Sequence, residues 1–346
     1  MASEQDPVAW GIVGYGWVAR DYMAPGIRAA EHRLVAVADP GEASRAAAEA
    51  EGARAYARLE DLVNDPEIEA VYVATPNHLH REAIEALAGS GKAILCEKPM
   101  AASLDEAEAM VAALRGGETF YGTAFDQRHH PAHRAIRDVV RAGRLGTVTA
   151  LRIVYACWLD RGFSPLPGHD NWRVDRARAG GGAFIDLAPH GLDLAGFLLD
   201  DPLDAVAVMA QARVHDYAVQ DHGVDDGAML VGRTAGGVLA SLHVAYNHPD
   251  QLPRRRLEIV GTGGLVVAEN TMGQDAGGRV TLTGLDGVPE PIPFDGTASP
   301  FLEQVRAFGA ALRDPALRTA WSIERDIRTM RLVARAGDDI AAPRAA

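Results

Sequence analysis

A glycine-rich stretch near the N-terminus constrains the fold of this chain more than any other feature. It reads Gly11-Ile-Val-Gly14-Tyr-Gly16-Trp-Val-Ala19 and contains the pattern Gly-x-Gly-x-x-Ala from residue 14 to residue 19. An apolar run over 8–13 precedes it, and a helical pattern over 18–30 follows it. Gly14 permits a tight turn, Gly16 lets a pyrophosphate approach the backbone, and the start of the helix attracts phosphate. The pattern therefore predicts a parallel α/β domain that binds a dinucleotide.

The residues around these glycines indicate which dinucleotide is bound. Tyr15, Trp17 and Val18 belong to the same turn, and we expect them to contact the cofactor. Asp39 ends the second expected strand, where its carboxylate can accept hydrogen bonds from the ribose diol of NAD. The same charge would repel the ribose phosphate of NADP, so we expect NAD rather than NADP. The alternative interpretation is a βαβ turn without a ligand.

The first 125 residues alternate apolar strand-like runs with alanine-rich helical stretches. We expect strands at 8–13, 34–38, 70–74, 93–96 and 119–122. We expect helices at 18–30, 42–51, 79–88 and 104–114. Strands that alternate with helices form βαβ units and a parallel sheet. Residues 1–125 are therefore predicted to form a Rossmann-type domain of the α/β class.

The pattern changes after residue 125. Helices are expected at 131–142, 184–199, 299–313 and 321–337, and a strand at 148–157. Six further strands, separated by Gly-rich turns, are expected at 205–213, 226–233, 237–246, 256–260, 264–268 and 279–283. Consecutive strands joined by tight turns indicate an antiparallel sheet. Residues 126–346 are therefore predicted to form an α+β domain on an open, mainly antiparallel sheet.

Composition excludes several classes of protein. The formal net charge is −13, which argues against a nucleic-acid partner, so we expect a small-molecule partner. No apolar run approaches the ~18 residues that a membrane helix needs. The N-terminus lacks the basic and apolar segments of a secretory signal, and only two cysteines occur. We therefore expect a cytoplasmic protein without membrane association.

A polar loop follows the expected strand at 70–74. It contains Thr75, Pro76, Asn77 and His80. Ligands of doubly wound sheets bind at the carboxyl ends of the strands, so these residues could line the nicotinamide half of the site. The alternative is a polar loop in which Asn77 caps the next helix.

Glu97 and Lys98 follow the expected strand at 93–96, at the same edge of the sheet. Of the 34 basic residues, only Lys92 and Lys98 are lysines. Lysine can lose its proton when it is buried, whereas arginine effectively cannot. Lys98 could donate a hydrogen bond to a substrate oxygen, and Glu97 could bind the nicotinamide ribose. A surface turn without a function is the alternative.

Asp186 and His190 are four residues apart in the helix expected at 184–199, which places them on one face. Asp186 could orient His190 or raise its basicity, and imidazole is suited to general acid–base catalysis near neutral pH. Considered alone, this pattern is also typical of a structural pair or of half a metal site.

Together these motifs resemble those of the Gfo/Idh/MocA family of NAD(P)-dependent oxidoreductases. The matching stretches are 11–19, 70–80, 94–100 and 171–190, and the resemblance covers essentially the whole chain. It implies that Lys98, Asp186 and His190 form the catalytic group. It also places Gln127, Trp172 and Arg173 near the cofactor.

The resemblance further implies a sugar, amino sugar or cyclitol as substrate, oxidised or reduced at a secondary alcohol or ketone. In this interpretation the substrate hydroxyl lies between Lys98 and His190. The family associates through the open face of its C-terminal sheet, so residues 205–294 are expected to form the interface of a homodimer or homotetramer. Two alternatives remain open: a redox-neutral, NAD-dependent glycosidase or lyase, and a non-catalytic regulator that binds NAD or a sugar.

Further polar residues are candidates for substrate contacts in the second domain. They are Tyr155, His169, Asp170 and His243, for which a structural or surface position is equally open. The histidine-rich stretch 128–133 suggests a zinc site, but no nearby carboxylate or thiolate completes a convincing one. We therefore expect no metal.

Overall fold

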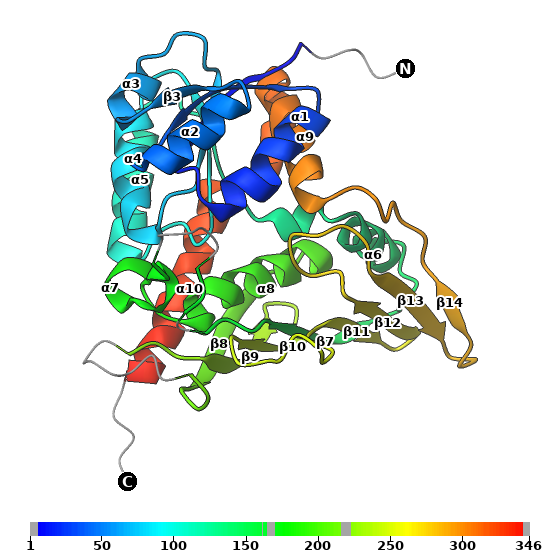
Figure 1. Cartoon of the computed structure of the whole chain (residues 1–346). Helices are drawn as coiled ribbons and strands as arrows, with labels where there is room; N and C mark the ends of the chain where they lie inside the picture. Colours follow the sequence, from blue (N-terminus) through cyan, green and yellow to red (C-terminus); the bar gives the residue numbers. More distant parts are fainter. Residues whose placement is uncertain (1–5, 161, 165–169, 216–222, 342–346) are drawn as a thin grey trace. The chain divides into compact units, whose positions relative to one another are not determined.

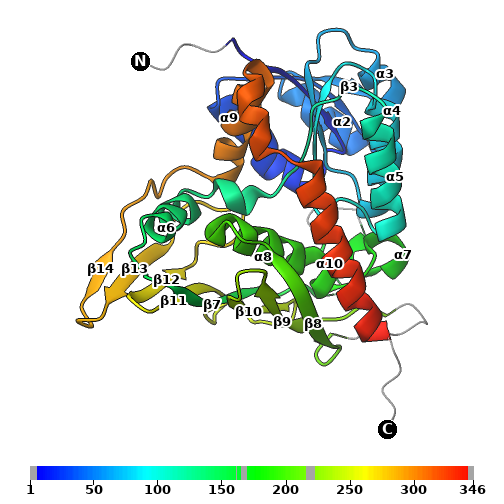
Figure 2. The same ribbon diagram turned by 180° about the vertical axis from the view of Figure 1, so that it is seen from behind.

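The computed structural model describes residues 6–160, 162–164, 170–215 and 223–341 (Figures 1 and 2). The described residues up to 124 and those from 301 to 328 form one compact unit, here called the N-terminal unit. The remaining described residues form the C-terminal unit. None of the helices in these ranges is long and apolar enough to cross a membrane.

The N-terminal unit contains a six-stranded parallel sheet with the order β3-β2-β1-β4-β5-β6. Its strands are β1 (Ala9–Val13), β2 (Arg33–Ala38), β3 (Arg54–Tyr56), β4 (Ala70–Val73), β5 (Ala93–Cys96) and β6 (Tyr121–Thr123). The strand order reverses between β1 and β4, which makes this point the topological switch where doubly wound sheets bind ligands. The predicted Rossmann-type fold is confirmed.

Helices connect these strands. They are the π-helix η1 (Ala19–Met23), α1 (Ala24–Ala29), α2 (Glu42–Ala50), α3 (Leu59–Val63), η2 (Asn77–Leu79), α4 (His80–Leu87) and α5 (Leu104–Arg115). The sequence pattern missed β3 and α3 because a strand of three residues and a helix of five show too few repeats to reveal a period.

A segment near the C-terminus completes the core of the N-terminal unit. It contains α9 (Pro300–Arg313) and η5 (Pro315–Ala320). The ring of Phe308 on α9 packs against Trp10 of β1, with 5.5 Å between the ring centroids. A Cβ atom at Gly122 of β6 would lie 2.4 Å from the ring of Trp321, so this strand needs glycine there. The buried aromatic rings therefore join the two ends of the chain within one core.

The C-terminal unit contains an eight-stranded sheet with the order β14-β13-β12-β11-β7-β10-β9-β8. Its strands are β7 (Val148–Ala156), β8 (Leu203–Gln211), β9 (Gly227–Thr234), β10 (Leu239–Ala245), β11 (Arg255–Gly261), β12 (Gly264–Glu269), β13 (Arg279–Gly284) and β14 (Pro289–Pro291). All pairs are antiparallel except β7 with β10. The mainly antiparallel sheet is confirmed. The parallel central pair was not predicted, because strand pairing between distant segments leaves no local signal.

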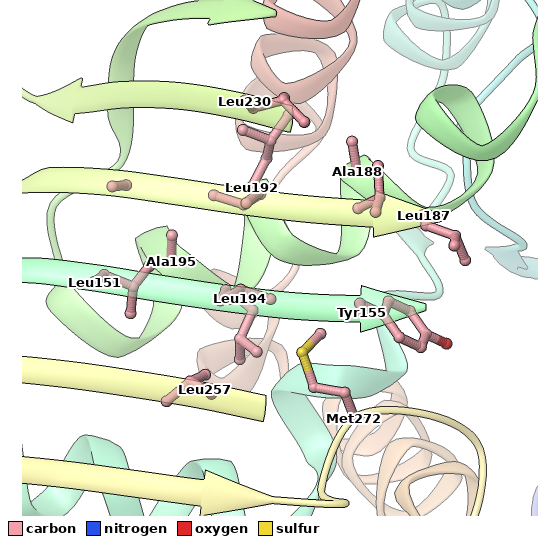
Figure 3. Packing of buried hydrophobic residues seen from close by; sticks show 14 of the residues in the cluster. Leu151, Tyr155, Leu187, Ala188, Leu192, Leu194, Ala195, Leu230, Leu257 and Met272 are labelled. Atoms are coloured by element: carbon pink, nitrogen blue, oxygen red, sulfur yellow. The ribbon is translucent and has the colours of Figure 1, made fainter. Parts of the chain in front are cut away.

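Helix α8 (Ala183–Leu199) packs on one face of this sheet against β7 and β10. Figure 3 shows Leu192, Leu194 and Ala195 of α8 among the buried side chains of the sheet. The other helical segments of this unit are η3 (Asp126–His129), α6 (Pro131–Arg141), η4 (Trp172–Val174), α7 (Arg176–Ala179) and the part of α10 (Ile323–Ala341) from residue 329 onward. One apolar face of α8 therefore fixes the helix that carries Asp186 and His190.

Candidate active site

The two glycines of the turn after β1 have different surroundings. Gly14 has a φ of +84°, and a Cβ atom there would lie 2.9 Å from the carbonyl carbon and oxygen of Ala74. Gly16, by contrast, has no atom within 4 Å of the position where a Cβ would be. The fold itself requires glycine at 14, whereas the space above Gly16 is open to a ligand. This open space fits the pyrophosphate of a dinucleotide.

Asp39 is fixed at the end of β2 by backbone hydrogen bonds. Its carboxylate accepts from the N–H of Tyr15 at 2.7 Å and from the N–H of Gly41 at 2.7 Å. Arg45 donates to the carbonyl oxygens of Asp39 and Pro40, at 2.9 and 2.7 Å. The carboxylate is thus held in one orientation beside the glycine turn, as a ribose-binding acceptor requires.

The side chains of the turn itself do not all face the open space. Tyr15 is buried, its hydroxyl donates to Glu51 at 2.8 Å, and burial raises its pKa. Trp17 packs edge-on against Tyr22, with 5.6 Å between the ring centroids. Val18 lies in the first helical turn. A contact of Tyr15 with a cofactor would therefore involve its backbone rather than its ring.

His80 connects two loops at the carboxyl edge of the sheet. Its imidazole is fully buried, with Nε2 3.0 Å from the carbonyl oxygen of Thr75 and Nδ1 3.1 Å from that of Pro99. Burial lowers its pKa. His80 therefore supports the loops after β4 and β5 from within, and its ring does not line an open site.

The rest of the loop after β4 offers one unused polar group. The hydroxyl of Thr75 is buried and has no hydrogen-bond partner in the described part of the chain. Asn77 is buried in η2, directly after Pro76. A buried hydroxyl without a partner is uncommon in a folded protein and is consistent with a ligand at this loop.

Glu97 and Lys98 directly follow β5. The carboxylate of Glu97 accepts hydrogen bonds from the hydroxyl of Tyr72 and, at 3.1 Å, from the backbone N–H of Lys98. The peptide bond between Lys98 and Pro99 is cis. Glu97 is thus anchored by its neighbours, while the side chain of Lys98 remains partly exposed.

Lys92, the other lysine, has a different environment. Its ammonium group is buried and donates to the carbonyl oxygens of Asp65 at 2.7 Å and Ile68 at 3.0 Å. Burial lowers its pKa. Lys92 therefore has a structural position before β5, whereas Lys98 follows β5, at the carboxyl edge where doubly wound sheets in general bind ligands.

In the C-terminal unit, His190 is buried on α8 beside two side chains that come from other elements. Its Nδ1 lies 3.2 Å from Oδ1 of Asp126, which belongs to η3. The ring of Tyr155, from β7, meets the imidazole edge-on at 5.3 Å between centroids. Sequence reasoning did not single out Asp126, because no local pattern links it to α8.

Asp186 lies one turn before His190 on the same helix. Its carboxylate accepts a hydrogen bond of 2.7 Å from the hydroxyl of Tyr246, which is fully buried. Burial and the charge of Asp186 raise the pKa of Tyr246 well above its usual value, so this phenol stays protonated. Tyr246 therefore holds the carboxylate of Asp186 in place, a partner that the spacing of Asp186 and His190 could not reveal.

The start of α8 depends on Asp225. Its carboxylate accepts from the N–H groups of Gly182 at 3.1 Å and Phe184 at 2.8 Å, and thus caps the helix. A Cβ atom at Gly182 would lie 2.0 Å from the carbonyl oxygen of Asp225. Burial raises the pKa of Asp225 to about 6. This close approach explains why a glycine precedes the helix that carries Asp186 and His190.

Three predicted cofactor contacts also lie in the C-terminal unit. Gln127 is buried, and its amide donates to Asp126 at 2.8 Å and exchanges hydrogen bonds with the backbone of Gly273. The guanidinium of Arg173 stacks on the ring of Trp172 at 4.6 Å. The Gln127 amide is therefore committed to the protein itself, while Trp172 and Arg173 form a pair that is not fully buried.

The predicted substrate residues lie in different places. Tyr155 contacts His190, as described above. Leu242 packs closely against Gly191 of α8, and neighbouring residues of a strand point to opposite faces, so His243 lies on the other face of the sheet. Asp170 is exposed and forms an ion pair with an arginine. His169 lies outside the described residues.

The histidines after η3 have structural partners. The ring of His130 accepts from the N–H of Ala132 at 3.2 Å, and His133 lies 2.7 Å from the carbonyl oxygen of Gln127 and 3.1 Å from Oγ1 of Thr271. Burial lowers their pKa values to about 4 and about 3. Within the described ranges, no three His, Cys, Asp or Glu side chains are arranged to hold a metal ion.

Comparison with known proteins extends this description. A family model described as "Oxidoreductase family, NAD-binding Rossmann fold" matches residues 8–125, and one described as "GFO/IDH/MocA C-terminal domain" matches residues 133–267. The chain is 35% identical over 307 residues to 1,5-anhydro-D-fructose reductase of Ensifer adhaerens, covering 88% of this chain and 87% of the relative. It is 33% identical over 272 residues to inositol 2-dehydrogenase of Rhizobium meliloti, covering 76% of each. The structure of an aldose-aldose oxidoreductase from Caulobacter crescentus matches with a TM-score of 0.84 and 23% identity, over 97% of this chain and 98% of that chain.

Proposed function

This chain belongs to the Gfo/Idh/MocA family of oxidoreductases and has an NAD-binding Rossmann domain, and on this basis we propose its reaction. It interconverts a secondary alcohol and a ketone of a sugar, amino sugar or cyclitol. The names of two relatives, 1,5-anhydro-D-fructose reductase and inositol 2-dehydrogenase, support this substrate class. The observation that carries the proposed chemistry is the buried imidazole of His190 beside a carboxylate, an arrangement suited to a general base.

The N-terminal unit would hold the cofactor. The open space above Gly16 would receive the pyrophosphate, Asp39 would bind the adenosine ribose, and Glu97 would bind the nicotinamide ribose. When bound, NAD supplies the acceptor or donor of the hydride. The fixed carboxylate of Asp39 favours NAD over NADP, because a ribose phosphate would meet a negative charge.

Lys98 and His190 would act on the reacting oxygen. In the oxidation direction, Nε2 of His190 accepts the hydroxyl proton, and the ammonium of Lys98 donates a hydrogen bond that stabilises the developing alkoxide. Asp186, one turn before His190 on α8, would assist this proton transfer. In the reduction direction the same proton returns from His190 to the carbonyl oxygen.

An absorbance screen tests the proposed function. The purified protein is incubated with NAD and a panel of sugars, amino sugars and inositols, and NADH formation is followed. Net NADH formation with at least one of these substrates is expected. Product formation without net NADH would favour a redox-neutral glycosidase or lyase, and tight binding without any turnover would favour a regulator.

We also propose that the chain forms a homodimer or homotetramer through its C-terminal sheet. Met209, Met229, Val231 and Leu239 are each more than half exposed, at 51–61%, on β8, β9 and β10. Exposed apolar side chains on neighbouring strands are typical of an association surface. Sedimentation at micromolar concentration should show an oligomer that Val231→Asp dissociates, and a monomeric wild-type protein would contradict the proposal.

A cytoplasmic location is part of the same proposal. Both cysteines are free thiols. Burial together with the charge of Asp186 raises the pKa of Cys157 to about 12, so this thiol stays protonated. Two free thiols are consistent with a reducing compartment. Cell fractionation with an antibody against the chain tests this location.

A further inference from the structure

We propose that Asp126 is the positioning residue that sets the tautomer of His190 and stabilises its protonated form. This inference rests on the proposed function for its effect on catalysis, but the side-chain arrangement can be tested without turnover. Oδ1 of Asp126 and Nδ1 of His190 lie 3.2 Å apart, and both side chains are about 5% exposed. Neither atom has a hydrogen-bond partner elsewhere in the described part of the chain. A small rotation of the ring would convert this contact into an N–H···O hydrogen bond.

The position of Asp126 is determined by its neighbour. Nε2 of Gln127 donates to Oδ2 of Asp126 at 2.8 Å and to the carbonyl oxygen of Gly273 at 2.9 Å. Oε1 of Gln127 accepts from the N–H of Gly273 at 3.2 Å. One carboxylate oxygen of Asp126 is thus occupied by a fixed amide, and the other is directed at the imidazole.

The other acids near His190 have different partners. Asp186 accepts from the hydroxyl of Tyr246, and Asp193, one turn after His190 on α8, forms an ion pair of 2.5 Å with Arg128 of η3. From β7, Tyr155 faces the ring, and burial raises its pKa well above the usual value, so it stays neutral. Asp126 is therefore the described carboxylate that is placed against Nδ1.

This placement has a chemical consequence. A carboxylate accepts hydrogen bonds only, so Asp126 favours the tautomer with the proton on Nδ1. Nε2 of His190 is then left with a free lone pair, which can accept the hydroxyl proton of the substrate as the O–H bond breaks and an N–H bond forms. The resulting imidazolium carries its positive charge beside the negative charge of Asp126, and a charge-assisted hydrogen bond forms.

The substitution Asp126→Asn inverts this arrangement. Because Gln127 donates to the Oδ2 position, the oxygen of Asn would occupy that position and its NH₂ group would face His190. The amide would then donate to Nδ1 and force the proton onto Nε2, where it blocks proton acceptance. A wrong tautomer of this kind is strongly inhibitory, so we expect kcat to fall about 100-fold. Asp126→Ala leaves both tautomers available and should lower kcat less, about tenfold.

The test combines kinetics with NMR of the full-length protein. For Asp126→Asn, kcat should fall while the KM of the substrate and the affinity for NAD stay within about threefold, because only the proton transfer is impaired. For Asp126→Ala, kcat should fall about tenfold, again with the KM of the substrate and the affinity for NAD within about threefold of the wild-type values. A wild-type kcat in both variants would overturn the proposal.

The ¹⁵N spectrum of histidine-labelled protein provides a readout that does not depend on activity. The signals of His190 are assigned by their loss in His190→Ala. The wild-type protein should show the Nδ1-protonated tautomer, and Asp126→Asn should show the Nε2-protonated one. The same tautomer in both proteins would overturn the proposal, whereas a tautomer switch in a protein that turns over no substrate would refute only the proposed function.

Asp193→Asn is the matched control. It removes another buried acid next to η3, but one that is paired with Arg128. Its kcat should stay within about threefold of the wild-type value, and its His190 tautomer should be the same. Its stability should fall, because the partly buried Arg128 loses the carboxylate with which it pairs. Equal losses of kcat in Asp193→Asn and Asp126→Asn would overturn the specific role of Asp126. If Asp126→Asn does not fold, the kcat of Asp126→Ala, expected to fall about tenfold, is compared with that of Asp193→Asn instead.

Discussion

The glycine turn after β1 in the N-terminal unit and the His190 cluster in the C-terminal unit, formed by His190, Asp186, Asp126, Tyr155 and Tyr246, are built in opposite ways. In the turn, Gly14 lies against the backbone of Ala74, which follows β4. The carboxylate of Asp39 accepts hydrogen bonds from backbone N–H groups that follow β1 and β2. In the cluster, His190 and Asp186 meet side chains from η3, β7 and the residue after β10. The turn thus depends on where the backbone leaves space, and the cluster depends on which side chains meet.

This difference predicts how each region responds to substitution. In the turn, a single added methyl group can block the fold or the ligand, depending on the glycine that receives it. In the cluster, a change of one charged or proton-carrying atom should alter the chemistry while the backbone stays in place. The following experiments test this contrast.

The largest effect is expected for the two groups that would touch the reacting oxygen. Lys98→Arg keeps the positive charge but has a planar, bulkier donor group, and His190→Ala removes the base. Loss of a general acid–base group typically costs about 10²–10⁴-fold, so kcat should fall at least ~100-fold in each variant. The affinity for NAD, measured by titration, should change little.

Lys92→Arg provides the matched control for Lys98→Arg. Lys92 is buried against backbone carbonyls, so its replacement should lower the melting temperature and leave kcat within about threefold. If Lys98→Arg kept more than a tenth of the wild-type kcat, the proposed role of Lys98 would be wrong.

The two glycines of the turn should separate stability from binding. Gly14→Ala places a methyl group against Ala74 at a positive φ, and should lower the free energy of unfolding by about 1–3 kcal/mol. Gly16→Ala points a methyl group into open space, so the stability should be unchanged while NAD binds at least tenfold more weakly. Chemical unfolding and calorimetric titration measure the two quantities. Wild-type NAD affinity in Gly16→Ala would show that the open space is not the cofactor site.

Asp39 should set the choice of cofactor. NAD is expected to bind at least tenfold more tightly than NADP to the wild-type protein, because a ribose phosphate would be repelled by the fixed carboxylate. Asp39→Asn removes the charge and should narrow this difference. Equal affinities of the wild-type protein for both dinucleotides, measured by titration, would contradict the role assigned to Asp39.

The smallest effect concerns stability in mild acid. Burial lowers the pKa values of His130 and His133 to about 4 and about 3, so both stay neutral in the folded protein at pH 6. In the unfolded chain they titrate near pH 6.5, so the unfolded state binds more protons and stability falls as the pH drops below that value. Each histidine should therefore lower the free energy of unfolding by about 1 kcal/mol at pH 6 relative to pH 8. Urea unfolding at pH 6 and 8 measures the loss, and a variant His133→Asn should show a smaller pH dependence. A stability that rises on acidification would contradict these two assignments.

The same contrast explains what the sequence could predict. Gly14, Gly16 and Asp39 lie in short patterns whose spacing reflects backbone geometry, so the Rossmann-type sheet of the N-terminal unit could be predicted from them and from the alternating strands and helices. The partners of His190 could not be predicted, because Asp126 and Tyr155 come from elements that only tertiary packing brings to α8. His80 shows that a local pattern can also suggest a contact that packing does not favour. Its position after β4 indicated a ligand contact, whereas both of its ring nitrogens face backbone carbonyls.

Transfer of deuterium tests the central claim most directly. A substrate found in the absorbance screen is labelled with deuterium on the carbon that bears the reacting hydroxyl, and the NADH formed is analysed by mass spectrometry. The account predicts that the label appears in the nicotinamide ring with the wild-type protein, and that its rate of appearance falls at least ~100-fold in His190→Ala. Turnover of the labelled substrate with no deuterium in NADH would contradict direct hydride transfer. Transfer at the wild-type rate in His190→Ala would contradict the role of the His190 cluster.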